Sequence, residues 1–425
     1  WLIEVIIIFL ALKMFFLKRD LIFTGGEKIV DFLFVALIFV SLLSAVLNEV
    51  HPISYLIGMR GYVKYAFFFY VLINLDISVL IMRRLFGIFW FFVSLQPIAS
   101  FLQWTKYGFS QPDWNGGTMA VAHGGTAILG VITGMYVSLG LAFYLEMQVK
   151  KYLLPIIGLL LALGLADAKT GFVFVIIAIL TVLTYRSFCR RPRLFFRKFV
   201  IPISVISICL YGAVETASKR LSVDIVDLVL DAKWAWTILT EVDITGDMED
   251  ARPTNEDAEF FQLHTSYLSR IFNIQYTLQY MDKLAGYGLL GAGAGATNPS
   301  FAKEFSGQVY RDHARIYGPG ERVFWTQFSS SLIDWGYIGF AVLLGLYCAV
   351  LVVNTRFYIH CEDLYWRSVS LFLTGSIVVL LSSIFYQKVM VADVLGFSIW
   401  FTFAMIITKR KEDRRRIIDI GDRLG

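Results

Sequence analysis

The sequence predicts an all-α, polytopic membrane protein, and three observations support that prediction. Apolar residues make up 57% of the 425 residues and charged residues only 17%, against roughly 45–50% and about 25% in soluble domains. The mean hydropathy is +0.66. The apolar residues form unbroken runs close to the roughly twenty that a bilayer needs, not the alternating segments of a barrel strand. This composition excludes a cytosolic enzyme, a disordered chain and a secreted disulfide scaffold.

Eleven apolar runs are visible as candidate spans, because in hydrocarbon only helices and closed barrels satisfy their own backbone groups. They cover residues 1–17, 29–47, 53–75, 80–104, 126–145, 152–168, 171–188, 199–214, 332–354, 368–387 and 393–408. The chain starts with Trp1 and not with Met, so we expect one further span before it, twelve in all.

The positions of Lys and Arg between the spans predict the orientation of the chain. Basic residues gather in every second connection, at 83–84, 150–151 and 190–198, and again in the tail from 409 to 416. These connections and the tail are therefore predicted to be cytoplasmic, and the alternate connections external.

One external connection, residues 215–331, differs from all the others. It holds ten Lys and Arg against sixteen Asp and Glu, a net charge of −6, and the rest of the chain carries +11. Its amphipathic runs 224–240 and 265–285 predict helices. The sequence thus divides into an N-terminal transmembrane bundle (1–214), an external helical loop domain (215–331), and C-terminal transmembrane helices with a basic tail (332–425).

Cations at the external ends of spans are candidates for an anion site, because charge is costly in lipid. Arg60 and Lys64 are four residues apart and share one helical face. Either an anionic ligand or a carboxylate of another span would satisfy them. Lys169 stands two residues before Gly171 at the start of a span. A cation beside free N–H groups attracts anions, and an ordinary tight turn with a snorkelling lysine is the alternative.

The long loop supplies the other candidates. Arg270 lies on the second amphipathic run, ahead of the glycine-rich segment 286–295. Small residues there allow a close backbone approach to a ligand or to another helix, and a plain linker is the alternative.

A general base is also expected in this loop. Glu321 or His313, near Arg315 and Arg322, could accept a proton from a sugar hydroxyl while arginine holds phosphate charge, and His264 competes for that role. A solvated charged loop is the alternative. No acidic or cysteine spacing indicates a metal site, so no metal and no cofactor are expected.

The layout and three local motifs resemble the O-antigen polymerase and ligase superfamily of membrane glycosyltransferases. The motifs are Lys169-Thr170-Gly171 at the start of a span, Arg270 followed by the segment 287–293 (YGLLGAG), and residues 331–339 (SLIDWGYIG) leading into the span after the loop. The resemblance implies a bacterial inner-membrane enzyme whose active site faces the periplasm. It also implies an undecaprenyl-diphosphate-linked glycan as donor and as acceptor, with a chain-length regulator as a protein partner and no nucleic acid.

One departure from the family favours a polymerase over a ligase. Ligases carry a His-Asn pair nine residues before the acidic position of the third motif, where this chain has Trp325-Thr326. The family arginine of the first motif is Lys169 here, which keeps the charge but loses bidentate phosphate binding.

The expected function is therefore polymerisation of lipid-linked repeat units into O-antigen or a similar surface polysaccharide. Glu321 is the leading general base, with His313 and His264 as substitutes. The lipid tail is expected in an apolar groove between spans. A ligase that transfers the glycan to lipid A core, and a transporter of lipid-linked glycans, are the two alternatives. The expected diphosphate ligands are Arg60, Lys64, Lys169 and Arg270, supported by Arg322.

Overall fold

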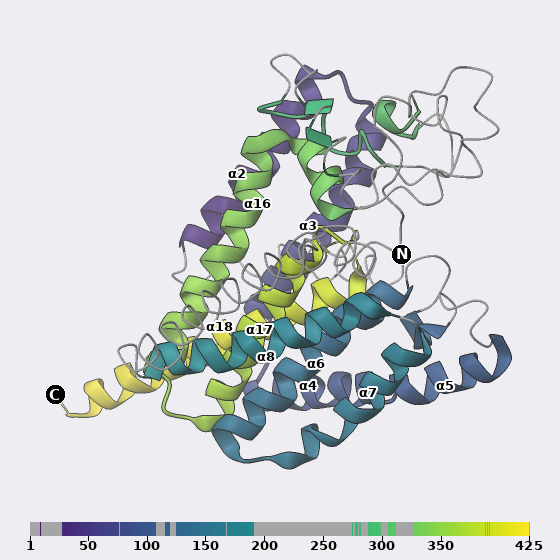
Figure 1. The fold of residues 1–425 in the computed structure, drawn as a ribbon. Helices are drawn as coiled ribbons and strands as arrows, with labels where there is room; N and C mark the ends of the chain where they lie inside the picture. The colour runs from purple at the N-terminus through teal and green to yellow at the C-terminus, as the bar shows by residue number, and fades with distance from the viewer. Residues whose placement is uncertain are drawn as a thin grey trace, which may run out of the picture.

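A computed structural model describes most of the chain outside the long loop. The described residues are 28–75, 77–107, 115–119, 125–166, 168–190, 288–298, 305–311, 326–386 and 392–424, with a few single positions between them. Every regular element in these ranges is a helix, which confirms the all-α prediction (Figure 1). The elements are α2 (Lys28–Leu47), α3 (Pro52–Asn74), α4 (Val79–Ser94), α5 (Gln96–Tyr107), η2 (Gly117–Met119), α6 (Gly125–Met147), η3 (Lys150–Tyr152), α7 (Leu154–Leu165), α8 (Lys169–Arg190), α16 (Gln327–His360), α17 (Leu364–Ser383) and α18 (Asp393–Leu424).

Within the described residues, seven helical segments are long and apolar enough to cross a membrane. They indicate a membrane-embedded protein. The segments are Lys28–Leu47, Pro52–Asn74, Val79–Lys106, Gly125–Met147, Thr170–Arg190, Gln327–His360 and Leu364–Ser383.

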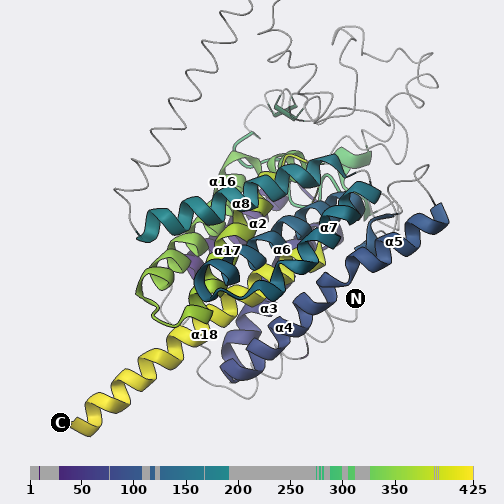
Figure 2. The ribbon, with the colours of Figure 1, turned by 60° about the horizontal axis from the view of Figure 1, so that its bottom comes forward.

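The remaining expected spans differ from these seven. The runs 1–17 and 199–214 lie outside the described residues. The run 152–168 is shared between η3 and the 12-residue α7, which ends at Leu165, so it is not among these seven segments. Helix α18 covers the expected run 393–408 and continues as one helix through the basic tail (Figure 2).

Helix α6 is the centre of the bundle. It packs most extensively against α17 and α8, and 17 of its 23 residues are buried. Small residues allow this close packing, as they do in membrane bundles generally. A Cβ atom on Gly375 of α17, for example, would lie 2.4 Å from Ser138 Oγ of α6. Helix α2 packs along α16, and α3 packs along α18.

The outer helices expose apolar side chains, as lipid-facing helices do. Phe32 and Phe39 of α2, and Ile88 and Phe92 of α4, are all more than half exposed. We therefore take the exposed faces of α2 and α4 to contact acyl chains.

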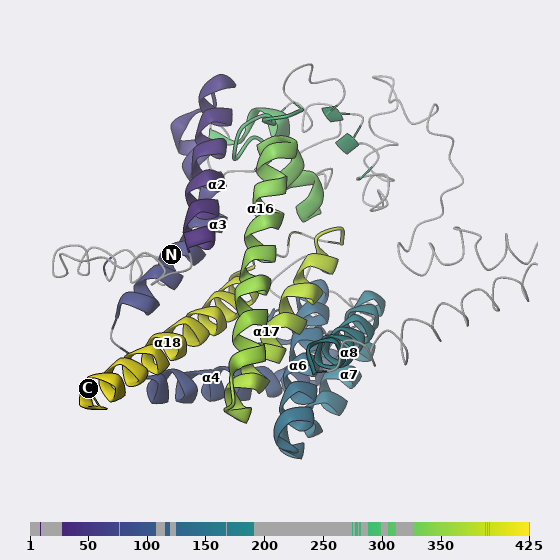
Figure 3. The same ribbon diagram turned by 90° about the vertical axis from the view of Figure 1, so that its left-hand side faces the viewer.

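The bundle has two chemically different ends. The end where α2 stops and α3 and α16 begin carries residues 288–298, which we call the glycine turn, and we name it the turn end (Figure 3). Helix α17 stops beside the first residues of α16, and α8 begins beside the residues that follow α17, as the contacts between Phe328 and Ile384 and between Phe174 and Tyr386 show. The end where α6, α8 and α16 stop and α17 begins is the basic end.

Candidate functional site

The glycine turn docks on α16 at a break in that helix. Gly336 has φ 68° and ψ −174°, a conformation essentially restricted to glycine. The backbone N–H groups of Tyr337 and Ile338, which follow the break, donate to the carbonyl oxygens of Gly288 and Leu289 at 3.0 and 3.1 Å. The glycine turn thus replaces the hydrogen-bond partners that α16 loses at its break.

The other side of the glycine turn lies against α3. A Cβ atom on Gly295 would stand 2.2 Å from Ser54 O, and one on Gly58 of α3 would stand 2.4 Å from Gly295 Cα. Only hydrogen atoms fit between the two backbones at these points. The close approach that the glycine-rich sequence predicts is therefore an approach to two helices, α3 and α16.

The carboxylate of Asp334 ties the turn to α16. Its Oδ1 accepts a hydrogen bond from the Thr297 N–H at 2.9 Å, and its Oδ2 accepts one from the Gly295 N–H at 3.2 Å. Asp334 is only 6% exposed. The acidic residue of the third motif is thus a structural anchor, and both of its oxygens are occupied.

A network of polar side chains joins the first turns of α16 to neighbouring elements. The amide nitrogen of Gln327 donates to Tyr62 Oη of α3 and to Ser331 Oγ, the latter at 2.7 Å. The amide oxygen of Gln327 accepts from the Met390 N–H at 3.2 Å. Because Gln327 and Ser331 are almost fully buried, these bonds fix the connection between α17 and α18 against α16.

Lys388 lies in that same connection and was not singled out from the sequence. Its ammonium group interacts with the charge of Asp334, while burial lowers the pKa of Lys388 below its ordinary value. The signal was present in the sequence, because Lys388 is the one charged residue in the stretch 384–392, directly after an expected span. A cation in such a place is a functional candidate by default.

The predicted cations of α3 lie along its first half and at its middle, since Lys64 is the thirteenth of its 23 residues. Arg60 is half-buried. Lys64 forms an ion pair with Asp393, the first residue of α18, and Tyr65 Oη donates to the same carboxylate oxygen at 3.3 Å. For Lys64, the structure therefore shows the alternative partner, a carboxylate of another helix. Since the Asp393 side chain is 57% exposed, a competing anion can reach this pair.

Lys169 is the first residue of α8, but its side chain is outside the described part of the chain. Five further predictions also fall outside the described residues: Arg270, Arg322, Glu321, His313 and His264. Their roles stay predictions.

A polar cavity of about 220 Å³ lies between the α2–α3 connection and the glycine turn. Ala292 and Ala296 of the turn line it, together with Glu49 and His51. Glu49 has a φ of 49°, uncommon for a residue with a side chain. The other residues that line the cavity are Asn48, Val50, Ser54, Tyr280, Ser306, Gly307, Gln308, Val309 and Arg311.

An aromatic groove of about 180 Å³ opens between α3, α4 and α18. It begins one helical turn beyond the Lys64–Asp393 pair, because Phe68 and Phe397 each follow a member of that pair by four residues. The Phe68 and Phe397 rings meet edge to face at 4.9 Å. The other lining residues are Leu85, Phe86, Phe89, Trp90, Ser398, Phe401 and Thr402.

Comparison with known proteins does not assign a family. No protein-family model matches the chain, and no curated protein matches it. Among the described residues, no group of three or more His, Cys, Asp and Glu side chains is placed to hold a metal ion.

Proposed function

We propose that the protein is a membrane glycosyltransferase that polymerises lipid-diphosphate-linked oligosaccharide repeat units into O-antigen or a similar surface polysaccharide. One observation carries the proposal. Arg60 and Lys64 lie one turn apart on α3, and Lys388 lies in the α17–α18 connection that Gln327 ties to Tyr62 of α3. The aromatic groove begins one helical turn beyond Lys64. A ligand with an anionic headgroup and a long apolar chain would match these cations and the adjacent aromatic groove.

In this proposal the cations hold the diphosphate of the donor and the groove holds the start of its polyprenyl chain. Arg60, Lys64 and Lys388 are the described ligands, and the anion competes with Asp393 for Lys64 and with Asp334 for Lys388. Lys169, Arg270 and Arg322 complete the expected set. Neutralising the charge that develops on the departing diphosphate is the main contribution that fixed cations can make.

The acceptor repeat unit would occupy the polar cavity beside Glu49 and His51. Amide, hydroxyl and charged groups there suit the hydroxyls of a sugar, and Ala292 and Ala296 of the glycine turn line this cavity. A base, with Glu321 as the leading residue and His313 or His264 as substitutes, removes the proton of the acceptor hydroxyl. That oxygen then attacks the anomeric carbon of the donor as the lipid diphosphate leaves.

The proposed setting is the bacterial inner membrane, with the turn end on the periplasmic side and the basic end in the cytoplasm. The basic connections and tail favour this orientation. A chain-length regulator is the protein partner that we propose for such a polymerase.

The activity can be tested with the purified full chain and a defined undecaprenyl-diphosphate-linked repeat unit. We expect a ladder of extended glycans on gel electrophoresis. Transfer of the glycan to added lipid A core without extension would instead identify a ligase. Movement of an unextended repeat unit across proteoliposome membranes would identify a transporter.

One observation favours the transporter. Transporters build substrate sites at broken helices, and α16 is broken at Gly336 beside the buried Asp334. Both carboxylate oxygens of Asp334 are nevertheless occupied by the glycine turn. The break is also near one end of the helix, since Gly336 is the tenth residue of a helix of 34 that begins at Gln327. We therefore place the enzyme first.

Lys388 gives this proposal a pH dependence of known sign. Because its pKa is below the ordinary value, Lys388 loses its charge at a lower pH than a surface lysine. The affinity for a short-chain polyprenyl diphosphate should therefore fall as the pH rises from about 7 to 10. Removing the charge in Lys388→Gln should lower this affinity about ten-fold at neutral pH, the value of one hydrogen bond to a charged group.

Titration calorimetry over this pH range checks the expectation, with Lys388→Arg as the matched variant. Arginine stays charged to pH 12 and above. Lys388→Arg should therefore bind the diphosphate at neutral pH, and its affinity should fall less than that of the wild type as the pH rises. Identical pH profiles for the wild type and Lys388→Arg would remove Lys388 from the diphosphate site.

A further inference from the structure

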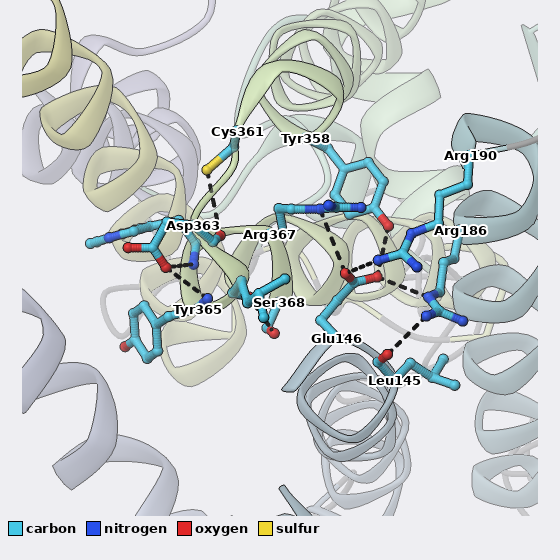
Figure 4. A network of polar contacts seen from close by, with 12 residues as sticks. Leu145, Glu146, Arg186, Arg190, Tyr358, Cys361, Asp363, Tyr365, Arg367 and Ser368 are labelled. Atoms are coloured by element: carbon cyan, nitrogen blue, oxygen red, sulfur yellow. Dashed lines mark hydrogen bonds and ion pairs between the residues drawn. The ribbon is translucent and has the colours of Figure 1, made fainter. Parts of the chain in front are cut away.

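A second concentration of charge lies at the basic end, away from the proposed site. The Glu146 side chain of α6 is fully buried, and three arginines converge on it (Figure 4). Arg186 Nε donates to Glu146 Oε1 at 2.9 Å, Arg190 of the same helix pairs with Oε2, and Arg367 Nε of α17 lies 3.5 Å from Oε2. Tyr358 Oη of α16 also donates to Oε1 at 2.9 Å. We call these five residues the Glu146 cluster.

The Glu146 cluster holds more positive charge than its carboxylate compensates. Three guanidinium groups face one carboxylate, which leaves an excess of two positive charges. Like charges held this close repel one another, and a second anion would relieve that repulsion.

The arginines also keep hydrogen-bond donors available. A guanidinium group has five N–H donors, and the hydrogen bonds of Arg186 and Arg190 to Glu146 and to the Leu145 carbonyl use three of their ten. The side chains of Arg186, Arg190 and Arg367 are 27%, 38% and 21% exposed, so the unused donors can reach a ligand from outside.

The position of the cluster limits what that ligand can be. Glu146 and Arg190 stand at the ends of α6 and α8, and Arg367 lies in the first turn of α17. The ends of membrane-spanning helices lie at the depth of lipid headgroups, where basic pockets between helices bind anionic headgroups. Guanidinium groups pair with phosphate oxygens through two parallel hydrogen bonds.

We infer that the Glu146 cluster binds a phosphate group at the basic end, with the headgroup of an anionic phospholipid as its source. The buried carboxylate orients the three arginines, and their outward N–H groups take the phosphate oxygens. This inference depends on the membrane location of the helices and not on the proposed glycosyltransferase activity.

The test uses the full chain in a neutral maltoside detergent with equimolar phosphatidylglycerol and phosphatidylcholine, followed by native mass spectrometry. We expect the wild type to retain phosphatidylglycerol preferentially. Arg190→Gln should weaken that retention about five-fold, the effect of one basic group near an anionic headgroup. Glu146→Gln, which removes the competing carboxylate, should strengthen it.

Arg356→Gln is the matched control, because Arg356 is an exposed arginine near the same end of α16 and outside the cluster. It should retain as much phosphatidylglycerol as the wild type. If Arg190→Gln equals Arg356→Gln, the inference is wrong, and this holds even if Glu146→Gln does not fold.

Inorganic phosphate distinguishes the source of the anion. If the protein retains phosphatidylglycerol in tens of millimolar phosphate, the result supports the lipid headgroup as the ligand. If phosphate displaces the lipid from the wild type, and binds more weakly to Arg190→Gln, the Glu146 cluster is a phosphate site whose ligand is a free anion. No preference for phosphatidylglycerol and no effect of phosphate would overturn the site.

Discussion

Replacing Gly336 with alanine is expected to separate the glycine turn from α16 and to abolish chain extension. Backbone strain at this φ and ψ costs roughly 1–3 kcal/mol for a residue with a side chain. In addition, the new Cβ would stand 2.4 Å from Gly291 N and from Leu289 O, two backbone atoms that cannot move independently. The free energy of unfolding should fall by at least the strain.

Equilibrium unfolding in mixed micelles measures that loss, with Gly87→Ala as the control. A Cβ on Gly87 of α4 meets no atom within 4 Å, so alanine should be neutral or slightly stabilising in this helix interior. Equal stability of Gly336→Ala and Gly87→Ala would show that the break in α16 is not needed for the fold.

The second large effect is expected for Asp334→Asn. Asparagine keeps the shape of the side chain, but its NH₂ group must face one of the two backbone N–H groups that donate to Asp334 in the wild type. A lost hydrogen bond to a charged group costs about 1.5–3 kcal/mol, so the glycine turn should dock less stably and chain extension should fall. Unfolding in mixed micelles and protease sensitivity near residues 288–298 are the measurements.

Asp363→Asn provides a matched control for this substitution. Asp363 also accepts from two backbone N–H groups, those of Tyr365 and Trp366, but it is exposed at the N-terminus of α17. Asparagine is as good a helix N-cap as aspartate, so this variant should stay near wild-type stability. If Asp334→Asn lowers the free energy of unfolding no more than Asp363→Asn does, Asp334 does not anchor the glycine turn.

A double-mutant cycle tests the interaction between Asp334 and Lys388. In Asp334→Asn, the partly buried Lys388 loses the carboxylate that opposes its desolvation. Adding Lys388→Gln should then recover part of the lost stability. The free energy of unfolding should therefore fall less in the double variant than the sum of the losses in the two single variants. Strict additivity would mean that the two charges do not interact.

The sequence predicted the helices best where apolar runs are long and uninterrupted. The runs 29–47 and 53–75 match α2 and α3 within a residue at each end. The run 332–354 is shorter than α16, because the polar residues from Gln327 to Ser331 are helical only where Tyr62 and the α17–α18 connection satisfy their side chains. Hydropathy cannot detect a polar turn that tertiary contacts bury.

The candidate site was predictable only in part. The cations of α3 and the glycine-rich segment stand out locally. By contrast, Asp334 meets Gly295 and Lys388, and Glu146 meets Arg186 and Arg367, across long separations in sequence. Which cations find a carboxylate, as Lys64 finds Asp393, depends on such long-range contacts and not on local spacing.

The most direct test of this account compares chain extension by the wild type, Lys388→Gln and Arg356→Gln on one defined undecaprenyl-diphosphate-linked repeat unit. Because Lys388 belongs to the proposed diphosphate site and Arg356 lies at the opposite end, the account predicts equal ladders from the wild type and Arg356→Gln. It predicts an initial rate at least ten-fold lower for Lys388→Gln at limiting substrate. A folded wild-type protein that extends nothing, or a Lys388→Gln variant that extends as fast as the wild type, would contradict it.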